Sequence, residues 1–323
     1  MKYFITLITI LTIGIAQDGK FGGLVFYNYN YDLTEKAPND NSNDNGFALN
    51  RVYFTYTQEL SKGISYKFQT DIDPLASPKE VYLKNAKVDW ESPIGKLTIG
   101  LQGMNVFNIA ENNWGFRFLE KSPMDKHEFS SSADMGVRYS GKLSVISYSL
   151  MVTNGTGYKK NEDDKYKKIS GQFIYGEKNL IKNNGINLGL AFTIEPAVKM
   201  PGRVTNGIVA PDTTENTTVI GLFGGYAGKG LRVGGEFDMR TDEVEDKKEQ
   251  IMAFYASYKI IDAIEGLVYY DIYESTQDNL TTKEASYIIA GLNYYPGKGL
   301  IITPNVRFKG STTLVMLNFQ FKF

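Results

Sequence analysis

The sequence predicts an all-β protein, a transmembrane antiparallel up-and-down β-barrel of about 16 strands with long extracellular loops and short periplasmic turns. Three observations predict this fold class. Apolar and polar residues alternate at every second position in many short segments, and the connections between these segments are alternately long and short. The chain also ends on an alternating aromatic segment.

Residues 1–16 have the composition of a cleaved signal peptide for export. Lys2 precedes an apolar run from Phe4 to Ile15, and small residues precede the expected cut after Ala16. The run is too short for a membrane-spanning helix, which needs about 20 apolar residues. We therefore expect residues 17–323 to form a single outer-membrane domain. An amphipathic or buried N-terminal segment is the alternative.

Composition narrows the function classes. The chain has no cysteine, which excludes disulfides, thiolate metal sites and a cysteine nucleophile, and no other apolar run has the length of a membrane-spanning helix. The chain has 22 tyrosines, 19 phenylalanines and 32 glycines, and its mean hydropathy is negative. This composition is typical of strands that have one apolar face and one polar, water-facing face. With 35 basic and 36 acidic residues, the chain is not expected to bind nucleic acid.

The clearest predicted strand is 64–73. Apolar residues occupy alternate positions at Ile64, Tyr66, Phe68 and Ile72, and polar residues fill the other face, a period of two rather than 3.6. Segments 186–195 and 231–240 repeat the pattern. Weaker alternation predicts the remaining strands at 21–32, 47–59, 80–91, 96–104, 134–141, 144–153, 166–176, 217–227, 249–260, 264–274, 284–295, 300–309 and 312–323. A tilted strand of about 10 residues matches the apolar band of an outer membrane.

The connections carry an independent signal. Long connections are predicted at 33–46, 105–133, 154–165, 196–216, 241–248 and 275–283, with tight turns between them at 60–63, 92–95, 227–230 and 296–299. An up-and-down barrel in an outer membrane has this alternation, with its long loops on one rim. A soluble β-sandwich or lipocalin-like barrel is the alternative, although such folds bury their apolar face.

The last predicted strand places apolar residues at Val315, Leu317, Phe319, Phe321 and Phe323. Aromatic strand ends occupy the interfacial girdle of outer-membrane barrels. The pattern also resembles the C-terminal signal by which such barrels are recognised for insertion. We therefore expect two partners, outer-membrane lipid and, through Phe323, the barrel-insertion machinery.

Short motifs between residues 47 and 152 carry a family resemblance. They are Leu49-Asn-Arg51, Phe68-Gln-Thr-Asp71, Leu83-Lys-Asn-Ala-Lys-Val88, Ile99-Gly-Leu-Gln102 and Ser132-Ala-Asp-Met-Gly-Val137. This third of the chain resembles the phosphate-selective porin (O and P type) family. The resemblance implies a water-filled channel, anions such as phosphate as solutes, and a homotrimer. The segment after Gln102 departs from that family because it lacks a basic residue and a proline.

Strand parity predicts which charged residues face the lumen. A barrel of about 16 strands is too wide for its side chains to fill, so an aqueous channel remains unless loops block it. The inward basic residues are predicted to be Arg51, Lys67, Lys87, Arg138, Arg232, Arg240, Arg307 and Lys309. The inward acidic residues are predicted to be Glu59, Asp71, Asp73, Asp89, Asp134, Glu195, Glu236, Asp238, Glu265 and Asp271. Such a balanced lining predicts weak ion selectivity, and cross-strand charge pairs that stiffen the wall are the alternative role.

From this set, the predicted pore-lining residues are Arg51, Lys67, Asp71, Lys87, Asp89, Arg138, Arg232, Glu236, Arg240 and Arg307. The longest predicted loop, 105–133, is expected to fold into the channel and constrict it. Its predicted constriction residues are Arg117, Glu120, Lys121, Asp125 and Lys126. An extracellular lid or a latch between subunits is the alternative for this loop.

Enzymatic and metal chemistry find little support. His127 is the single histidine, so histidine-clustered metal sites are excluded. Its neighbours Ser130, Ser131 and Ser132 lack the nucleophile elbow of a hydrolase. Asn39–Gly46 is rich in oxygen ligands but lacks the glutamate of a calcium loop. We expect no catalytic residue, metal or cofactor.

The predicted function is passive diffusion of small hydrophilic solutes, with anions such as phosphate among the candidates, through a channel in the bacterial outer membrane. A plugged or closed barrel is the alternative. Such a barrel would act as a ligand-specific transporter or would bind a partner through its loops.

Overall fold

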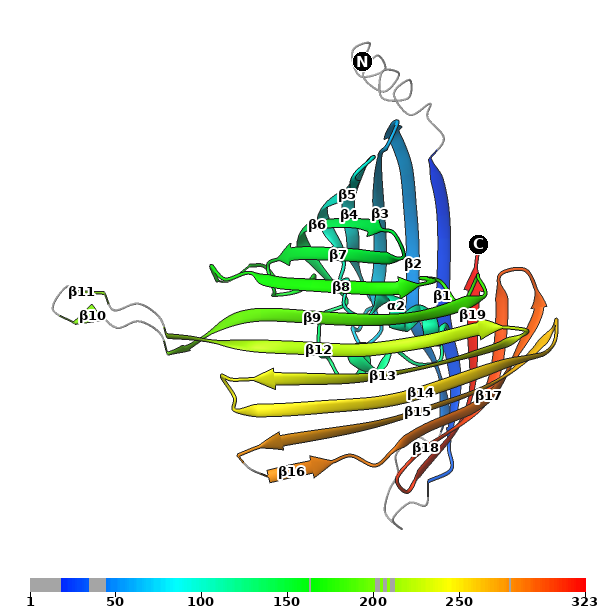
Figure 1. The fold of residues 1–323 in the computed structure, drawn as a ribbon. Coiled ribbons are helices and arrows are strands. Elements are labelled where there is room, and N and C mark those ends of the chain that lie inside the picture. Colours follow the sequence, from blue (N-terminus) through cyan, green and yellow to red (C-terminus); the bar gives the residue numbers. More distant parts are fainter. Residues whose placement is uncertain are drawn as a thin grey trace, which may run out of the picture.

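The structure is a computed structural model that describes residues 19–34, 45–162, 164–200, 204–205, 208–209, 213–278 and 280–323. Within these residues, 16 antiparallel strands form a closed barrel (Figure 1), which confirms the predicted fold class. The predicted signal peptide and most of Asn39–Gly46 lie outside the described residues. In the described part of the chain, no helix has the length and apolar character needed to cross a membrane.

The strands of the barrel wall follow one another along the chain. They are β1 (Lys20–Asp32), β2 (Asn45–Ser61), β3 (Ile64–Asp73), β4 (Glu80–Ser92), β5 (Gly95–Gly103), β6 (Ala133–Leu143), β7 (Ile146–Thr153), β8 (Lys168–Gly176), β9 (Gly185–Met200), β12 (Thr213–Gly228), β13 (Leu231–Asp242), β14 (Lys247–Ile261), β15 (Ile264–Gln277), β17 (Tyr287–Gly297), β18 (Leu300–Lys309) and β19 (Thr312–Lys322). Three short strands lie in loops: β10 (Val204–Thr205) pairs with β11 (Ile208–Val209), and β16 (Leu280–Lys283) pairs with β15.

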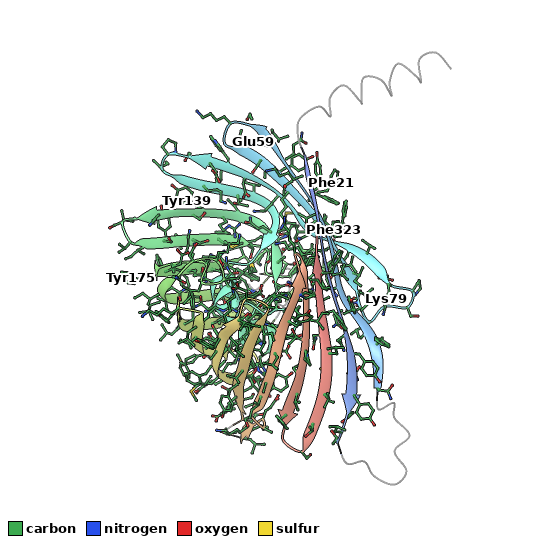
Figure 2. The ribbon with its side chains drawn as sticks, turned by 90° about the vertical axis from the view of Figure 1, so that its right-hand side faces the viewer. Phe21, Glu59, Lys79, Tyr139, Tyr175 and Phe323 are labelled. Carbon is green, nitrogen blue, oxygen red and sulfur yellow. The ribbon has the colours of Figure 1, made fainter. Side chains whose placement is uncertain are left out.

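The barrel closes between its first and last strands. β1 pairs with both β2 and β19, and the backbones of Gly23 and Phe323 exchange two hydrogen bonds of 3.1 Å. A Cβ on Gly23 would lie 2.1 Å from the Phe323 ring, so a larger residue there would displace that ring. Figure 2 shows Phe21 and Phe323 close together. Closure pairs the backbone groups that an open edge would expose to lipid.

The two faces of the wall differ as the alternation predicts. On β9, Ile186, Leu188 and Ile194 point outward and are exposed, whereas Asn187 and Thr193 point inward and are buried. The same apolar outer face continues around the barrel. An apolar exterior around a polar interior is the arrangement that a lipid bilayer requires of a barrel.

The connections are sorted between the rims as predicted. Two-residue turns at 62–63, 93–94, 229–230 and 298–299 lie on one rim, and the long loops lie on the other. Two connections break the alternation: the β8–β9 turn, 177–184, is long for its rim, and the β18–β19 turn, 310–311, is short for its rim.

Candidate pore and inner loop

The β5–β6 connection, residues 104–132, lies inside the barrel, and we call it the inner loop (Figure 1). It contains two short helices, α2 (Asn108–Trp114) and α3 (Pro123–Lys126), which contact β12, β13 and β14. Gly115 ends α2 in a left-handed conformation, with φ of 82°. A glycine at this position is a common way to end a helix, because it has no Cβ to clash.

Two apolar clusters attach the inner loop to one side of the wall. The first joins loop residues Met104, Val106, Phe107, Ile109, Ala110, Met124 and Phe129 to wall residues Met151, Ile174, Ala191, Val219, Phe223 and Ile251. The second joins Trp114, Phe116, Phe118 and Leu119 to Phe26, Tyr255, Leu267, Tyr269, Tyr287 and Ile289. Each large side chain that is fully buried in this way contributes about 1.5–3 kcal/mol. The inner loop is therefore part of the folded core.

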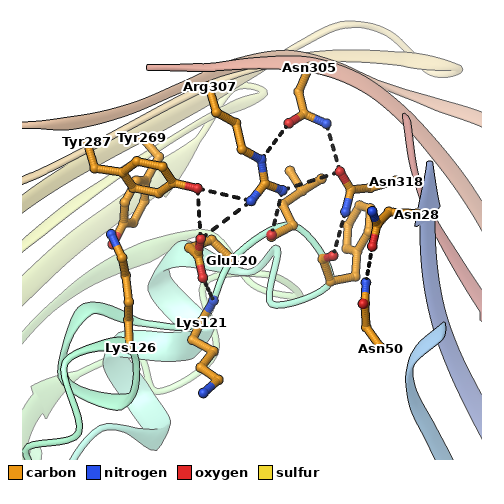
Figure 3. A network of polar contacts seen from close by, with 12 residues as sticks. Asn28, Asn50, Glu120, Lys121, Lys126, Tyr269, Tyr287, Asn305, Arg307 and Asn318 are labelled. Atoms are coloured by element: carbon orange, nitrogen blue, oxygen red, sulfur yellow. Dashed lines mark hydrogen bonds and ion pairs between the residues drawn. The ribbon is translucent and has the colours of Figure 1, made fainter. Parts of the chain in front are cut away.

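A polar network around Arg307 holds the middle of the inner loop (Figure 3). The guanidinium donates to the Leu119 carbonyl at 2.8 Å and lies 3.5 Å from a Glu120 carboxylate oxygen. The same Glu120 oxygen accepts from the Tyr287 hydroxyl at 2.9 Å, and Asn318 donates to the Phe118 carbonyl at 3.2 Å. Backbone carbonyls in the segment between α2 and α3 are thus satisfied by wall side chains.

Two further contacts fix the ends of the helices. Lys126 Nζ lies 2.7 Å from Asp271 Oδ2. Asn113 and Asn187 exchange two side-chain hydrogen bonds of 2.8 Å, and Asn187 also donates to the Glu177 carbonyl at 2.7 Å. The long β8–β9 turn therefore touches the same network as α2.

The five predicted constriction residues divide into two groups. Arg117 forms ion pairs with Glu111 and Asp125 inside the loop, at 2.7 Å for Asp125, and Lys121 is exposed beside them. Glu120 and Lys126 instead point at the wall, towards Arg307 and Asp271. The structure thus brings Arg117, Asp125 and Lys121 together at one lumen cavity, and Glu120 lines the neighbouring cavity with Arg117 and Lys121.

The ten predicted pore-lining residues also divide, because the inner loop covers half of the wall. Six lie on β2–β6, which the loop leaves uncovered: Arg51, Lys67, Asp71, Lys87, Asp89 and Arg138. The other four, Arg232, Glu236, Arg240 and Arg307, lie on β13 and β18. Of these, Arg232 stacks over the Phe116 ring of the inner loop at 4.6 Å, and Glu236 is buried.

Strand parity did not assign Lys84 or Lys168 to the inside of the barrel, although both are buried there. The β3–β4 register shifts between Gln69 and Thr70, so Lys84 is an extra residue in β4 and both it and Asn85 turn inward. Such a bulge reverses the inward and outward assignment beyond it. A second shift, between β1 and β2, turns Asn50 inward beside Arg51. Two adjacent polar residues, Lys84-Asn85 and Asn50-Arg51, are the only sequence signal of either bulge.

Glu236 and Asp238 are buried on β13 beneath the inner loop, and their carboxylate oxygens have no hydrogen-bond partner among the described residues. Their cross-strand neighbours are Phe223, Gly221, Ala253 and Ile251. Isolated charges in such a setting cost several kcal/mol. These two residues do not face the open lumen.

Cavities lie along the uncovered side of the barrel. One of about 490 Å³ on the extracellular side is lined by Arg51, Arg117, Lys121 and Tyr82 among others. One of about 690 Å³ on the periplasmic side is lined by Arg138, Lys96, Lys142 and Asn112 among others. Open space thus lies on either side of the inner loop, next to β2–β7.

The structure is a closed 16-stranded barrel with an apolar exterior, a polar lumen and a folded inner loop. These features define a class of proteins, the channel-forming barrels of the outer membrane. Residues 14–308 match the family model for Gram-negative porins, and the chain belongs to that family. The match supports a general porin, and the phosphate-selective type stays a prediction. No curated protein matches the chain.

Solved structures with the same fold include OmpF of Salmonella typhi, with a TM-score of 0.68, 12% identity, and coverage of 95% of this chain and 98% of that chain. A loop-deletion mutant of OmpT of Vibrio cholerae has a TM-score of 0.66, 12% identity, and coverage of 95% and 100%. A mutant of the porin of Rh. blastica has a TM-score of 0.59, 13% identity, and coverage of 95% and 100%.

Family and fold agree on the activity. The protein is a porin of the bacterial outer membrane, a channel through which small hydrophilic solutes diffuse passively. This confirms the predicted function and location.

Proposed function

We propose that this porin favours anions, that the inner loop is its constriction, and that solutes pass between the inner loop and the wall formed by β2–β6. The observation that carries the proposal is the separation of lumen charges between the two halves of the barrel. The sequence predicts nearly equal numbers of inward cations and acids, but along the passage the free cations outnumber the free carboxylates.

The uncovered half of the wall is rich in cations. Between the rims, β2–β6 places Arg51, Lys67, Lys87 and Arg138 on the lumen side, whereas Lys84 on the same wall is only 4% exposed and contacts Ser132 and the Tyr158 ring. Its carboxylates are largely engaged: Asp71 lies 3.7 Å from Arg51, Asp89 lies 2.8 Å from Lys87, and Asp134 accepts backbone hydrogen bonds. Within the described residues, Lys67 and Arg138 have no carboxylate within 4.0 Å.

The covered half holds the acids. Glu236, Asp238, Glu249 and Asp271 lie on β13–β15 and are at most 4% exposed. Because the inner loop lies between them and the passage, their charge is removed from the solute's path. A passage that presents more free cations than free carboxylates concentrates anions.

Lys67 and Lys87 add a second argument. They are direct cross-strand partners on β3 and β4, and like charges opposite each other destabilise a sheet. A permeating anion between them would offset that repulsion. The pair therefore marks a point in the passage where an anion is favoured.

We also propose a homotrimer, which is supported by a trimer form described for OmpT of Vibrio cholerae. Phosphate is one candidate solute, because the O and P type resemblance spans the strands that carry these cations. Phosphate added to a chloride solution should then reduce the chloride current.

Reversal potentials of the purified protein in planar bilayers, measured under a KCl gradient, test the anion preference. We expect the sign of an anion-selective channel, and a shift towards cations in K67Q and in R138Q, which remove charges that line the passage. K160Q removes the same charge from the exposed loop residue Lys160 and should leave the potential unchanged. A cation-selective wild type, or K67Q and R138Q values equal to that of K160Q, would overturn the proposal.

A further inference from the structure

The β7–β8 loop begins with residues 154–159, which we call the entrance segment. Two glycines turn this segment: Gly155 has φ of 104° and Gly157 has φ of 79°, conformations that other residues rarely adopt. The Gly155 amide donates to Asp134 at 2.7 Å, and a Cβ on Gly157 would lie 3.1 Å from Ser131. The segment therefore leaves β7 in a defined direction, against the end of the inner loop.

The entrance segment reaches the wall at β4, three strands away from β7 in the sheet order. The Tyr158 ring lies 5.6 Å from the ring of Tyr82, and Lys84 Nζ lies 3.5 Å from the centre of the Tyr158 ring. Lys159 Nζ lies 3.0 Å from Asp73 Oδ2, and this hydrogen bond raises the pKa of Lys159. The segment thus spans the lumen side of β5 and β6 at the extracellular end.

Open space continues beneath these side chains. Tyr158 and Lys159 line both extracellular cavities, of about 430 and 490 Å³, together with Arg51, Arg117 and Lys121. A solute that enters from the extracellular side on this route passes the entrance segment first and the inner loop second.

We propose that Tyr158 and Lys159 form a size filter at the channel entrance, in series with the inner loop. The filter selects by the width that these side chains leave between the entrance segment and the inner loop, so it acts on neutral solutes as well as ions. It goes beyond the proposed anion preference and does not depend on it.

The filter is held by side-chain contacts, which take no part in the backbone hydrogen bonds that pair the strands. An aromatic pair contributes about 0.5–1.5 kcal/mol and a cation–π contact about 0.5–1 kcal/mol. These two contacts hold the Tyr158 ring against β4. The Lys159–Asp73 pair is exposed, and such pairs contribute little. Tyr158→Ala should therefore open the entrance and leave the barrel intact.

Liposome swelling with a series of neutral sugars tests the filter, because uncharged solutes do not report on ion preference. In Y158A we expect the rate for sucrose relative to arabinose to rise severalfold, and in Y158F we expect the wild-type ratio because the ring remains. K159A should raise the ratio less than Y158A, and K160A, its matched control, should not raise it.

A difference in SDS-gel migration between unheated and heated samples verifies that each variant forms the barrel. If folded Y158A retains the wild-type sucrose-to-arabinose ratio, the proposal is overturned. It is also overturned if Y158F or K160A raises the ratio as much as Y158A does, because the effect would not then depend on the ring.

Discussion

Replacing Arg307 with alanine should release the inner loop without unfolding the barrel. Arg307 is 9% exposed and makes two contacts to the loop, to the Leu119 carbonyl and the Glu120 carboxylate. Its other partners, Asn305, Asn318 and Tyr287, belong to the wall. R307A therefore removes a link between the loop and the wall while all strand pairing remains.

The expected cost follows from the burial of the pair. Removing one partner of a buried ion pair costs about 3–5 kcal/mol. Glu120 is 18% exposed and keeps its bond from the Tyr287 hydroxyl, so we expect the lower end, about 3 kcal/mol. Since about 1.4 kcal/mol is a factor of ten, local opening of the loop should become about 100-fold more frequent.

Hydrogen exchange of the detergent-solubilised protein, followed by mass spectrometry, measures that opening. Peptides from 104–132 should exchange about 100-fold faster in R307A, whereas peptides from β13 should not change. K309A is the matched control, since Lys309 lies two residues along the same strand and pairs with Glu284 at the exposed rim. If the loop exchanges equally in R307A and K309A, Arg307 does not hold it.

Three further predictions use the same assays. D271N should speed exchange of the inner loop because it removes the charge that pairs with Lys126, whereas D238N should not, because Asp238 forms no ion pair with a described residue of the inner loop; equal effects would contradict this contrast. N113A should speed exchange of the α2 amides by an amount equivalent to about 1–3 kcal/mol, since Asn187 loses its buried amide partner; wild-type exchange in α2 would show that the pair is not needed. G157A should raise the sucrose-to-arabinose swelling ratio as Y158A does, because alanine is strained at φ of 79°; an unchanged ratio would mean that the turn tolerates a side chain.

The strands were predictable from the sequence because the alternation of apolar and polar residues that marks each strand lies within that strand. Ile64–Asp73 has one face for lipid and one for water whichever strand lies beside it, so its alternation predicted both its extent and its orientation. Tight turns such as Ser92–Gly95 are equally local. Together these signals determined the strand number, the sorting of loops between the rims and the oily exterior.

The candidate site was predictable only in part. The sequence identified the inner loop by its length and assigned Arg51, Lys67 and Arg138 to the lumen by parity. Parity failed for Lys84, because a bulge changes the register without leaving a clear pattern in the sequence. Parity also placed Glu236 and Arg51 together among the pore-lining residues. In the structure Glu236 is buried beneath the inner loop, whereas Arg51 faces the passage.

The sequence by itself determined a closed wall with an apolar outer face and a polar inner face, since the alternation of apolar and polar residues is a property of neighbouring residues. The tertiary structure alone decided which half of the wall the inner loop covers, because that depends on contacts between distant residues, such as Arg307 with Leu119, 188 positions apart. The position of the loop in turn decides which charges a solute meets, and no local pattern encodes it.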